Sequence, residues 1–427
     1  MNTSVKQTEI TGIGVITPVG TGIDQFAVAL KNGRTNFSMI ELTHADQLFS
    51  FPGAFVSNFY LNEQLRNLEL PVQIVNKIKK LRNISQSTAY SVYCAMEAWL
   101  DSDLGKSNID HERIAIVSAG SNIQQGMLIS VQQKHSGNLQ FLNPSYGLNF
   151  FDTDVIGVLS ELLDVKGEGH SIGAASASGN MSIIQGHRLL QLGLYDAVIV
   201  IAPLMDISIY EYQAFTSMGA MAALQPGLSS STLCRPFDMA HSGFLYGQSA
   251  GCVILESSEH AIKRGKRGYG AVAGYGVSMD ANRNPNPSAE GEKDAMLRAM
   301  YDAGVDPWQI DYVNTHGTAS VSGDDIEVEA MLLAGLKHVK ANSTKSLTGH
   351  GLSAAGLVEV IATVIQMKDG FLHPVINLVN PITNDISWIT GTSEIAAVNY
   401  GMSNSFGFGG INTSVIIKEG SVPNDNY

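Results

Sequence analysis

Two histidines in the second half of the chain stand where side chains often do chemistry. His316 follows a short apolar strand-like run and opens onto a loop of glycine, threonine and serine, and His350 precedes a long helical pattern. Residues at such positions often carry function, although a single loop histidine is more often structural. As a pair, two imidazole N–H groups could donate to one developing oxyanion.

A third segment, His170 to Asn180, is crowded with small residues and contains Ser176. The pattern predicts a strand-to-helix turn, because Met181 to Leu192 has helical periodicity. A side chain at this turn would lie near a helix N-terminus, where partial positive charge favours an anion. Taken alone, a turn with an N-capping serine is the better interpretation.

Apolar strand-like runs alternate with helical patterns through the chain and predict an α/β architecture. The two longest helical patterns fall in opposite halves, before and after Glu256, which is compatible with two similar α/β halves. The clearest strands are Arg113 to Ser118, Asp196 to Ala202 and Thr413 to Lys418. The clearest helices are Leu352 to Lys368, ended by Gly370, and Ser85 to Leu104, on which one apolar face is expected from Ala89, Val92, Tyr93, Met96 and Leu100.

Charge and composition exclude several classes of function. A net charge of −13 makes the chain a poor general binder of nucleic acid or of an anionic membrane. No apolar run reaches transmembrane length and no signal peptide is apparent, so we expect a cytoplasmic protein. The three cysteines have no metal-ligand spacing and are expected to be buried small hydrophobes: Cys94, Cys234 and Cys252.

The glycines between Thr11 and Pro18 come close to a dinucleotide-binding fingerprint. Thr17 stands where the third glycine should be, and no acidic residue follows at the right distance. We therefore do not expect a dinucleotide site.

Together these segments resemble the β-ketoacyl synthase family over nearly the whole chain. The resemblance is carried by Thr11 to Pro18, Arg235 to Asp238 with Gly243-Phe244, His316-Gly-Thr318 with its following Gly-Asp and Glu-Val-Glu-Ala, Ser343 to His350, and Asn404 to Asn412. It implies a homodimer with the thiolase fold, in which two pseudo-symmetric α/β halves form a five-layered α-β-α-β-α core. We place the halves at residues 1–256 and 257–427.

The resemblance also implies a Cys-His-His site. His316 and His350 match the two histidines, and Ser176 stands where the family has its nucleophilic cysteine. The other matching positions are Lys345 and Glu359 as supporting charges, Thr318 and Ser320 as phosphopantetheine-binding hydroxyls, and Phe408 as the gating phenylalanine of the Gly-Phe-Gly-Gly loop. The chain also departs from the family at His241-Ser242 and at Gln248, where relatives often carry acids.

Serine in place of cysteine changes the expected chemistry. A helix dipole, worth about 0.3–2 kcal/mol, cannot turn a serine hydroxyl into an alkoxide, so chain loading should be impaired. Decarboxylation of a malonyl thioester needs only that the enolate be stabilised, which two imidazole donors can do. The chain therefore resembles the serine-type ketosynthase-like decarboxylases of polyketide β-branching cassettes, which convert malonyl-acyl carrier protein to acetyl-acyl carrier protein.

The resemblance implies an acyl carrier protein as partner, and a hydroxymethylglutaryl synthase-like enzyme that uses the product. No metal or other cofactor is expected on the chain itself, since phosphopantetheine arrives on the carrier. The densest basic run could dock this acidic carrier or simply be a solvated helix face: Lys77, Lys79, Lys80 and Arg82. Lys263-Arg264 and Lys266-Arg267 are a weaker candidate.

Three other functions remain open from the sequence. One is a condensing enzyme that uses Ser176 as a slow nucleophile. A hydrolase or acyltransferase with Ser176 as its nucleophile is weaker, because Ala174 and Ser178 replace the glycines of a G-x-S-x-G motif. The last is a non-catalytic subunit like a chain-length factor, although such subunits need not keep both histidines.

Overall fold

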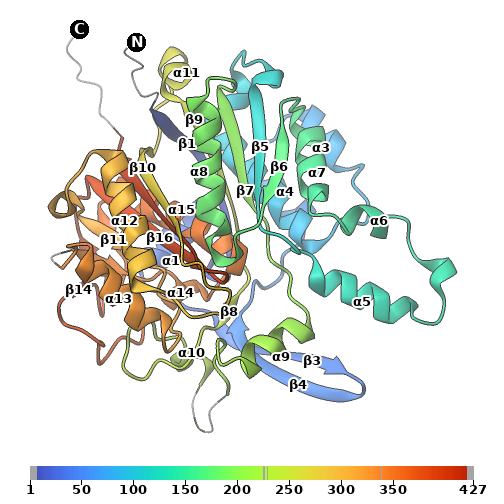
Figure 1. The fold of residues 1–427 in the computed structure, drawn as a ribbon. Helices are drawn as coiled ribbons and strands as arrows, with labels where there is room; N and C mark the ends of the chain where they lie inside the picture. The colour runs from blue at the N-terminus through green and yellow to red at the C-terminus, as the bar shows by residue number, and fades with distance from the viewer. Residues whose placement is uncertain (1–6, 225–226, 228, 338, 421–427) are drawn as a thin grey trace.

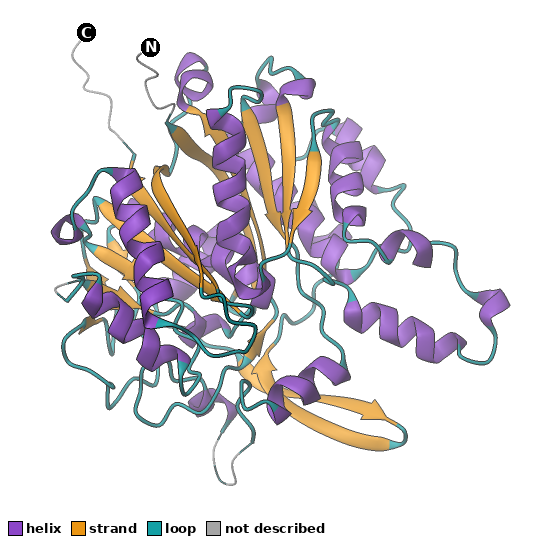
Figure 2. Cartoon of the chain, in the orientation of Figure 1, coloured by secondary structure: helices purple, strands orange, loops and turns teal. Residues whose placement is uncertain are grey.

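The computed structural model describes residues 7–420 except 225–226, 228 and 338. Its main feature is a 12-stranded mixed sheet with the order β14-β12-β11-β16-β17-β10-β1-β9-β7-β5-β6, in which β2 pairs with β1. One half of this sheet runs from β14 to β10 and the other from β1 to β6. The two halves are joined where Thr8–Ile10 of β1 pairs antiparallel with Gly270–Val272 of β10. Helices cover both faces (Figure 2).

The strands are β1 (Thr8–Thr17), β2 (Gly20–Thr21), β3 (Phe37–His44), β4 (Gln47–Ala54), β5 (Ile114–Ala119), β6 (Gly169–Ile172), β7 (Ala197–Ala202), β8 (Tyr246–Gly247), β9 (Ala250–Ser257), β10 (Gly270–Met279), β11 (Tyr312–Asn314), β12 (Lys340–Asn342), β13 (Phe371–Leu372), β14 (Ser387–Trp388), β15 (Glu394–Ile395), β16 (Tyr400–Gly407) and β17 (Ile411–Glu419). The α-helices are α1 (Ile23–Lys31), α2 (Leu61–Gln64), α3 (Val72–Ile78), α4 (Gln86–Ser102), α5 (Gln125–His135), α6 (Tyr146–Asn149), α7 (Thr153–Leu163), α8 (Ser178–Gln191), α9 (Ile209–Ser217), α10 (Ser230–Leu233), α11 (Ser258–Lys263), α12 (Ala289–Ala303), α13 (Gly323–Leu333), α14 (Lys345–Thr348) and α15 (Ala355–Asp369).

The alternation of side chains along the strands shows how the layers stack. On β7, Val198 and Val200 point into the central core with α8 and α15, while Ile199 and Ile201 point into an outer core with α4 and α7. On β17, Ile416 faces the other outer core, which α12 and α13 cover. The layers are therefore helix, sheet, helix, sheet, helix (Figure 1), which confirms the predicted thiolase fold. Because helices cover both faces of strands such as β7, the sequences of these strands are continuous apolar runs.

The two central helices pack closely because glycines face their neighbours. A Cβ atom on Gly179 of α8 would lie 2.3 Å from the backbone N of Leu357 on α15. A Cβ atom on Gly356 would lie 2.9 Å from Ser405 Oγ on β16. This close approach brings together the N-termini of α8 and α15, the two points that Ser176 and His350 precede.

The predicted strands and the helix before Gly370 are confirmed to within two residues at most ends, except the start of α15, where a 3-10 turn covers Leu352–Ala354. The prediction of one apolar face on Ser85 to Leu104 was wrong. Helix α4 is buried on most faces, because β1 and β9 pack on one side and α7 on another, whereas Ala89 and Leu100 are only half-buried.

The glycine motif near the N-terminus lies inside β1 and serves packing. A Cβ atom on Gly14 would lie 2.1 Å from the carbonyl oxygen of Cys94, so the missing side chain lets α4 rest on the strand. Within the described residues no helix has both the length and the apolar character needed to cross a membrane. The division of the chain at residue 256, the homodimer and the cytoplasmic location stay predictions.

Candidate active site

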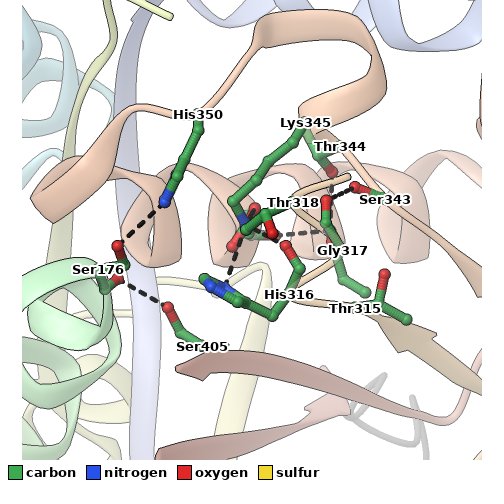
Figure 3. A network of polar contacts seen from close by, with 12 residues as sticks. Ser176, Thr315, His316, Gly317, Thr318, Ser343, Thr344, Lys345, His350 and Ser405 are labelled. Atoms are coloured by element: carbon green, nitrogen blue, oxygen red, sulfur yellow. Dashed lines mark hydrogen bonds and ion pairs between the residues drawn. The ribbon is translucent and has the colours of Figure 1, made fainter. Parts of the chain in front are cut away.

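Ser176, His316 and His350 meet at the ends of three elements (Figure 3). Ser176 lies in the turn between β6 and α8, His316 lies two residues after β11, and His350 lies between α14 and α15. Ser176 Oγ and His350 Nε2 are 3.0 Å apart. The two imidazole rings meet edge to face, with centroids 5.6 Å apart and planes at 85°. The structure thus brings the three predicted site residues together.

The turn at Ser176 is tightly held by its neighbours. Ala175 has φ +47°, a left-handed conformation that is unfavourable for alanine. The backbone N–H of Ala174 donates to Ser178 Oγ, which in turn donates to the carbonyl of Ala175. Ser405 Oγ donates to the carbonyl of Ser176 at 2.9 Å. The backbone of Ser176 is therefore held at the start of α8.

One backbone contact sets the proton of His350. The backbone N–H of Leu352 donates to His350 Nδ1 at 3.3 Å, so this nitrogen is an acceptor. A neutral imidazole carries one proton, which must then be on Nε2. Nε2–H consequently donates to Ser176 Oγ, and His350 cannot act as the base that removes the serine proton.

Lys345 sets the proton of His316 in a similar way. Its ammonium has three donors, and they go to His316 Nδ1 at 3.4 Å, to the carbonyl of His316 at 2.6 Å, and to Glu359 Oε1. Because an ammonium cannot accept, His316 Nδ1 is the acceptor and its Nε2 carries the proton. Lys345 therefore contacts His316, and Glu359 pairs with Lys345; both charged side chains are almost completely buried. Their supporting role stays a prediction.

Two carboxylates hold the loop after His316, although the motif that contains them, Gly-Asp followed by Glu-Val-Glu-Ala, predicted no role for either. Glu327 accepts from the backbone N–H groups of His316 and Gly317, both at 2.7 Å. Asp324 accepts from the backbone N–H groups of Thr318 and Ala319. The available signal was their spacing of three residues on the helix that follows the histidine loop, which puts both on one face of α13.

Burial keeps the two histidines in their neutral form. It lowers the pKa of both His316 and His350 well below the usual value, and the nearby charge of Lys345 lowers each pKa further. Burial also raises the pKa of Glu327 and of Glu359 to about 7. At neutral pH the two imidazoles are thus uncharged N–H donors.

No described cysteine can supply the missing thiolate. Cys94, Cys234 and Cys252 are free and buried, as predicted, and none of them lines the cavity at Ser176. Burial raises the pKa of all three thiols. The described residues also contain no cluster of three or more histidine, cysteine or acidic side chains that could hold a metal ion.

A cavity of about 240 Å³ opens in front of Ser176. The predicted residues Thr318, Ser320 and Phe408 line it together with both histidines. Phe408 is 44% exposed, and its ring centroid lies 6.4 Å from that of Phe215. Phe215 also lines the cavity and was not predicted from the sequence. Thr318 Oγ1 donates to Ser320 Oγ at 2.9 Å, so the two hydroxyls form one polar wall.

The predicted basic run lies elsewhere, on and after α3, and none of its four residues lines the cavity. The ammonium of Lys77 donates to the carbonyl oxygens of Glu161 and Leu162 at the end of α7. Lys79, Lys80 and Arg82 are exposed. Docking by this run stays a prediction.

Comparison with known proteins places these features in a family. Models of the β-ketoacyl synthase N-terminal and C-terminal domains match residues 6–261 and 269–379. The chain is 36% identical to the polyketide biosynthesis malonyl-ACP decarboxylase PksF of Bacillus subtilis, over 97% of both chains. It is 30% identical to 3-oxoacyl-[acyl-carrier-protein] synthase 2 of Staphylococcus aureus, over 97% of this chain and 98% of the relative.

Solved structures agree in fold. The ishigamide ketosynthase/chain length factor superposes with a TM-score of 0.84 at 24% identity, covering 97% of this chain and 100% of the other. A β-ketoacyl synthase from Burkholderia phymatum superposes with a TM-score of 0.81 at 26% identity, covering 97% and 99%.

Proposed function

Because the chain belongs to the β-ketoacyl synthase family, we propose that it decarboxylates malonyl-acyl carrier protein to acetyl-acyl carrier protein. The observation that carries this proposal is the contact between Ser176 and His350. A hydroxyl replaces the thiol, and the nearest imidazole nitrogen holds a proton instead of accepting one. The 36% identity to a protein named as a malonyl-ACP decarboxylase also supports the proposed decarboxylation.

The reaction uses the two histidines as hydrogen-bond donors. When the substrate binds, Nε2–H of His350 turns from Ser176 Oγ to the thioester oxygen, which also accepts from Nε2–H of His316. The C–C bond to the carboxylate then breaks, and carbon dioxide leaves. The electron pair moves into an enolate whose oxygen the two donors stabilise, each by about 2.7–4 kcal/mol. Phe408, at the cavity wall, limits the access of water to the malonyl group.

The remaining cavity wall suits the arm that carries the substrate. The hydroxyls of Thr318 and Ser320 are placed to hydrogen-bond the amides of phosphopantetheine, which the acyl carrier protein brings. The chain itself then needs no cofactor. The acetyl carrier would be consumed by a hydroxymethylglutaryl synthase-like enzyme during polyketide β-branching.

A mass-spectrometric assay tests the function, with Ser176→Ala as the deciding variant. Wild-type protein should convert a malonyl-loaded carrier to the acetyl form with loss of carbon dioxide. Ser176→Ala should keep this activity within about tenfold, because a neutral hydrogen bond contributes about 0.5–1.5 kcal/mol. An acyl adduct on Ser176 would favour condensation instead, and an intact malonyl carrier with the wild type would overturn the proposal.

Carrier docking on the run at α3 has its own test. The double change Lys79→Glu and Lys80→Glu should raise the KM for malonyl-acyl carrier protein severalfold, and more at low salt, because it repels an acidic partner. Malonyl-pantetheine, which has no protein surface to dock, should be turned over as by the wild type. Lys106→Glu with Lys134→Glu, at two exposed lysines outside both basic runs, is the matched control. Equal KM values for the carrier substrate in wild type and Lys79/Lys80 variant would remove this docking site.

A further inference from the structure

The active-site cavity contains a buried acid to which the mechanism above gives no role. Glu292 lies in the first turn of α12 and lines the same cavity as Ser176, His316 and His350. Its side chain is almost fully buried, with 1% exposure. Its Oε2 atom makes no hydrogen bond to any residue that the structure describes. A buried polar atom without a partner costs about 1–3 kcal/mol, so its position calls for a reason.

The other carboxyl groups near Glu292 are engaged. Asp280 Oδ1 accepts from Asn412 Nδ2 at 2.6 Å, while Asp324 and Glu327 on α13 hold the backbone after His316. Asp280 and Glu292 are the acids among the described residues that line the cavity. Glu292 therefore combines a place on the cavity wall with an oxygen that is free to meet a ligand.

The surroundings favour the protonated form of Glu292. Burial raises the pKa of its carboxyl well above the usual value, and repulsion from Glu327, Asp280 and Asp324 raises it further. No described lysine, arginine or histidine forms an ion pair with it. The protonated carboxyl, which has a proton to give, is the form that this position favours.

Decarboxylation without an acyl acceptor creates a demand for such a proton. The carbanion at C2 of the acetyl enolate has no thioester to attack, so it must be protonated. The hydroxyls of Ser176, Thr318 and Ser320 are far weaker acids than a carboxyl group. The Nε2–H groups of the histidines are engaged by the enolate oxygen.

We propose that Glu292 is the general acid that protonates C2 of the enolate, an inference that rests on the proposed decarboxylation. The C–C bond to the carboxylate breaks, its electron pair enters the enolate, and the proton of Glu292 forms the new C–H bond at C2. The Glu292 carboxylate then takes a proton from water that enters as product leaves. The balance is malonyl thioester plus one proton to acetyl thioester plus carbon dioxide.

The test compares Glu292→Gln with Glu290→Gln on malonyl-acyl carrier protein. Glutamine has the shape and neutrality of the protonated acid but no acidic proton, so the melting temperature and KM should stay close to those of the wild type. The kcat for acetyl formation should fall about 100-fold, the usual contribution of a positioned general acid. Glu290, two residues earlier in the same helical turn, pairs with Lys293 and is 71% exposed, so its variant should keep the wild-type kcat.

A pH profile separates proton donation from a structural role. The wild-type kcat should decline as pH rises through the pKa of Glu292, because only the protonated acid can donate. Glu292→Gln should lose that decline, while any contribution from Glu327, Glu359, Asp280 and Asp324 should appear in both proteins.

The outcomes keep the two proposals apart. If the wild type leaves malonyl carrier intact, the proposed function fails. If the wild type is active but Glu292→Gln matches Glu290→Gln in kcat and in pH profile, only the role of Glu292 fails. A fall in kcat with an unchanged pH profile would also overturn proton donation.

Discussion

Replacing His350 or His316 with alanine should lower kcat/KM for decarboxylation roughly 100- to 1000-fold, since each removes one preorganised donor to the enolate oxygen. The donors are preorganised because the Nδ1 atom of each ring is already occupied. The backbone N–H of Leu352 donates to Nδ1 of His350, and the Lys345 ammonium donates to Nδ1 of His316. No proton has to move before the reaction starts.

The position of the donor can be tested as well as its presence. In His350→Gln the side-chain amide can reach about where Nε2 lies, whereas in His350→Asn it reaches only about as far as Nδ1. We therefore expect the glutamine variant to keep more activity than the asparagine variant, measured as acetyl-carrier formation at matched substrate. Equal activity of the two, or an alanine variant within threefold of the wild type, would contradict the donor role.

The strands and central helices could be predicted because their signals are local. Ala197 to Ala202 is a continuous apolar run, and β7 is buried on both faces. The helix before Gly370 was recognisable from its spacing and its stop, and Gly370 indeed ends α15 with φ +68°. Helix α4 was misread as one-sided, because nothing in its own sequence says that a second layer covers its back.

Which residues form the site could be predicted only through family resemblance. How the protons are placed on its histidines could not be predicted from the sequence. Ser176 and His350 are 174 residues apart in the sequence. The position of the proton on His350 depends on the backbone N–H of Leu352, which no sequence motif reveals. Glu290 and Glu292 are only two residues apart in the sequence, yet Glu290 is exposed and Glu292 is buried. Such differences arise from tertiary contacts and carry no signal in composition or spacing.

Lys345→Met is expected to be the most destabilising of the changes considered, by about 3–5 kcal/mol in the free energy of unfolding. The ammonium is 1% exposed and all three of its donors are used. Removing it leaves Glu359 buried without its partner, with Oε2 already lacking a hydrogen bond to any described residue. Urea denaturation measures the loss, and Lys340→Met, which removes an exposed pair with Glu394, should cost less than about 1 kcal/mol.

A second change at Glu359 separates stability from catalysis. Lys345→Met with Glu359→Met replaces the whole pair by apolar side chains of similar volume, and should recover most of the lost stability, because a buried ion pair is often no better than a hydrophobic one. Activity should not recover, since His316 Nδ1 and the His316 carbonyl both remain without their donor. A double variant that regains decarboxylation along with its stability would show that Lys345 only holds the fold, and that the proton on His316 is fixed by something else.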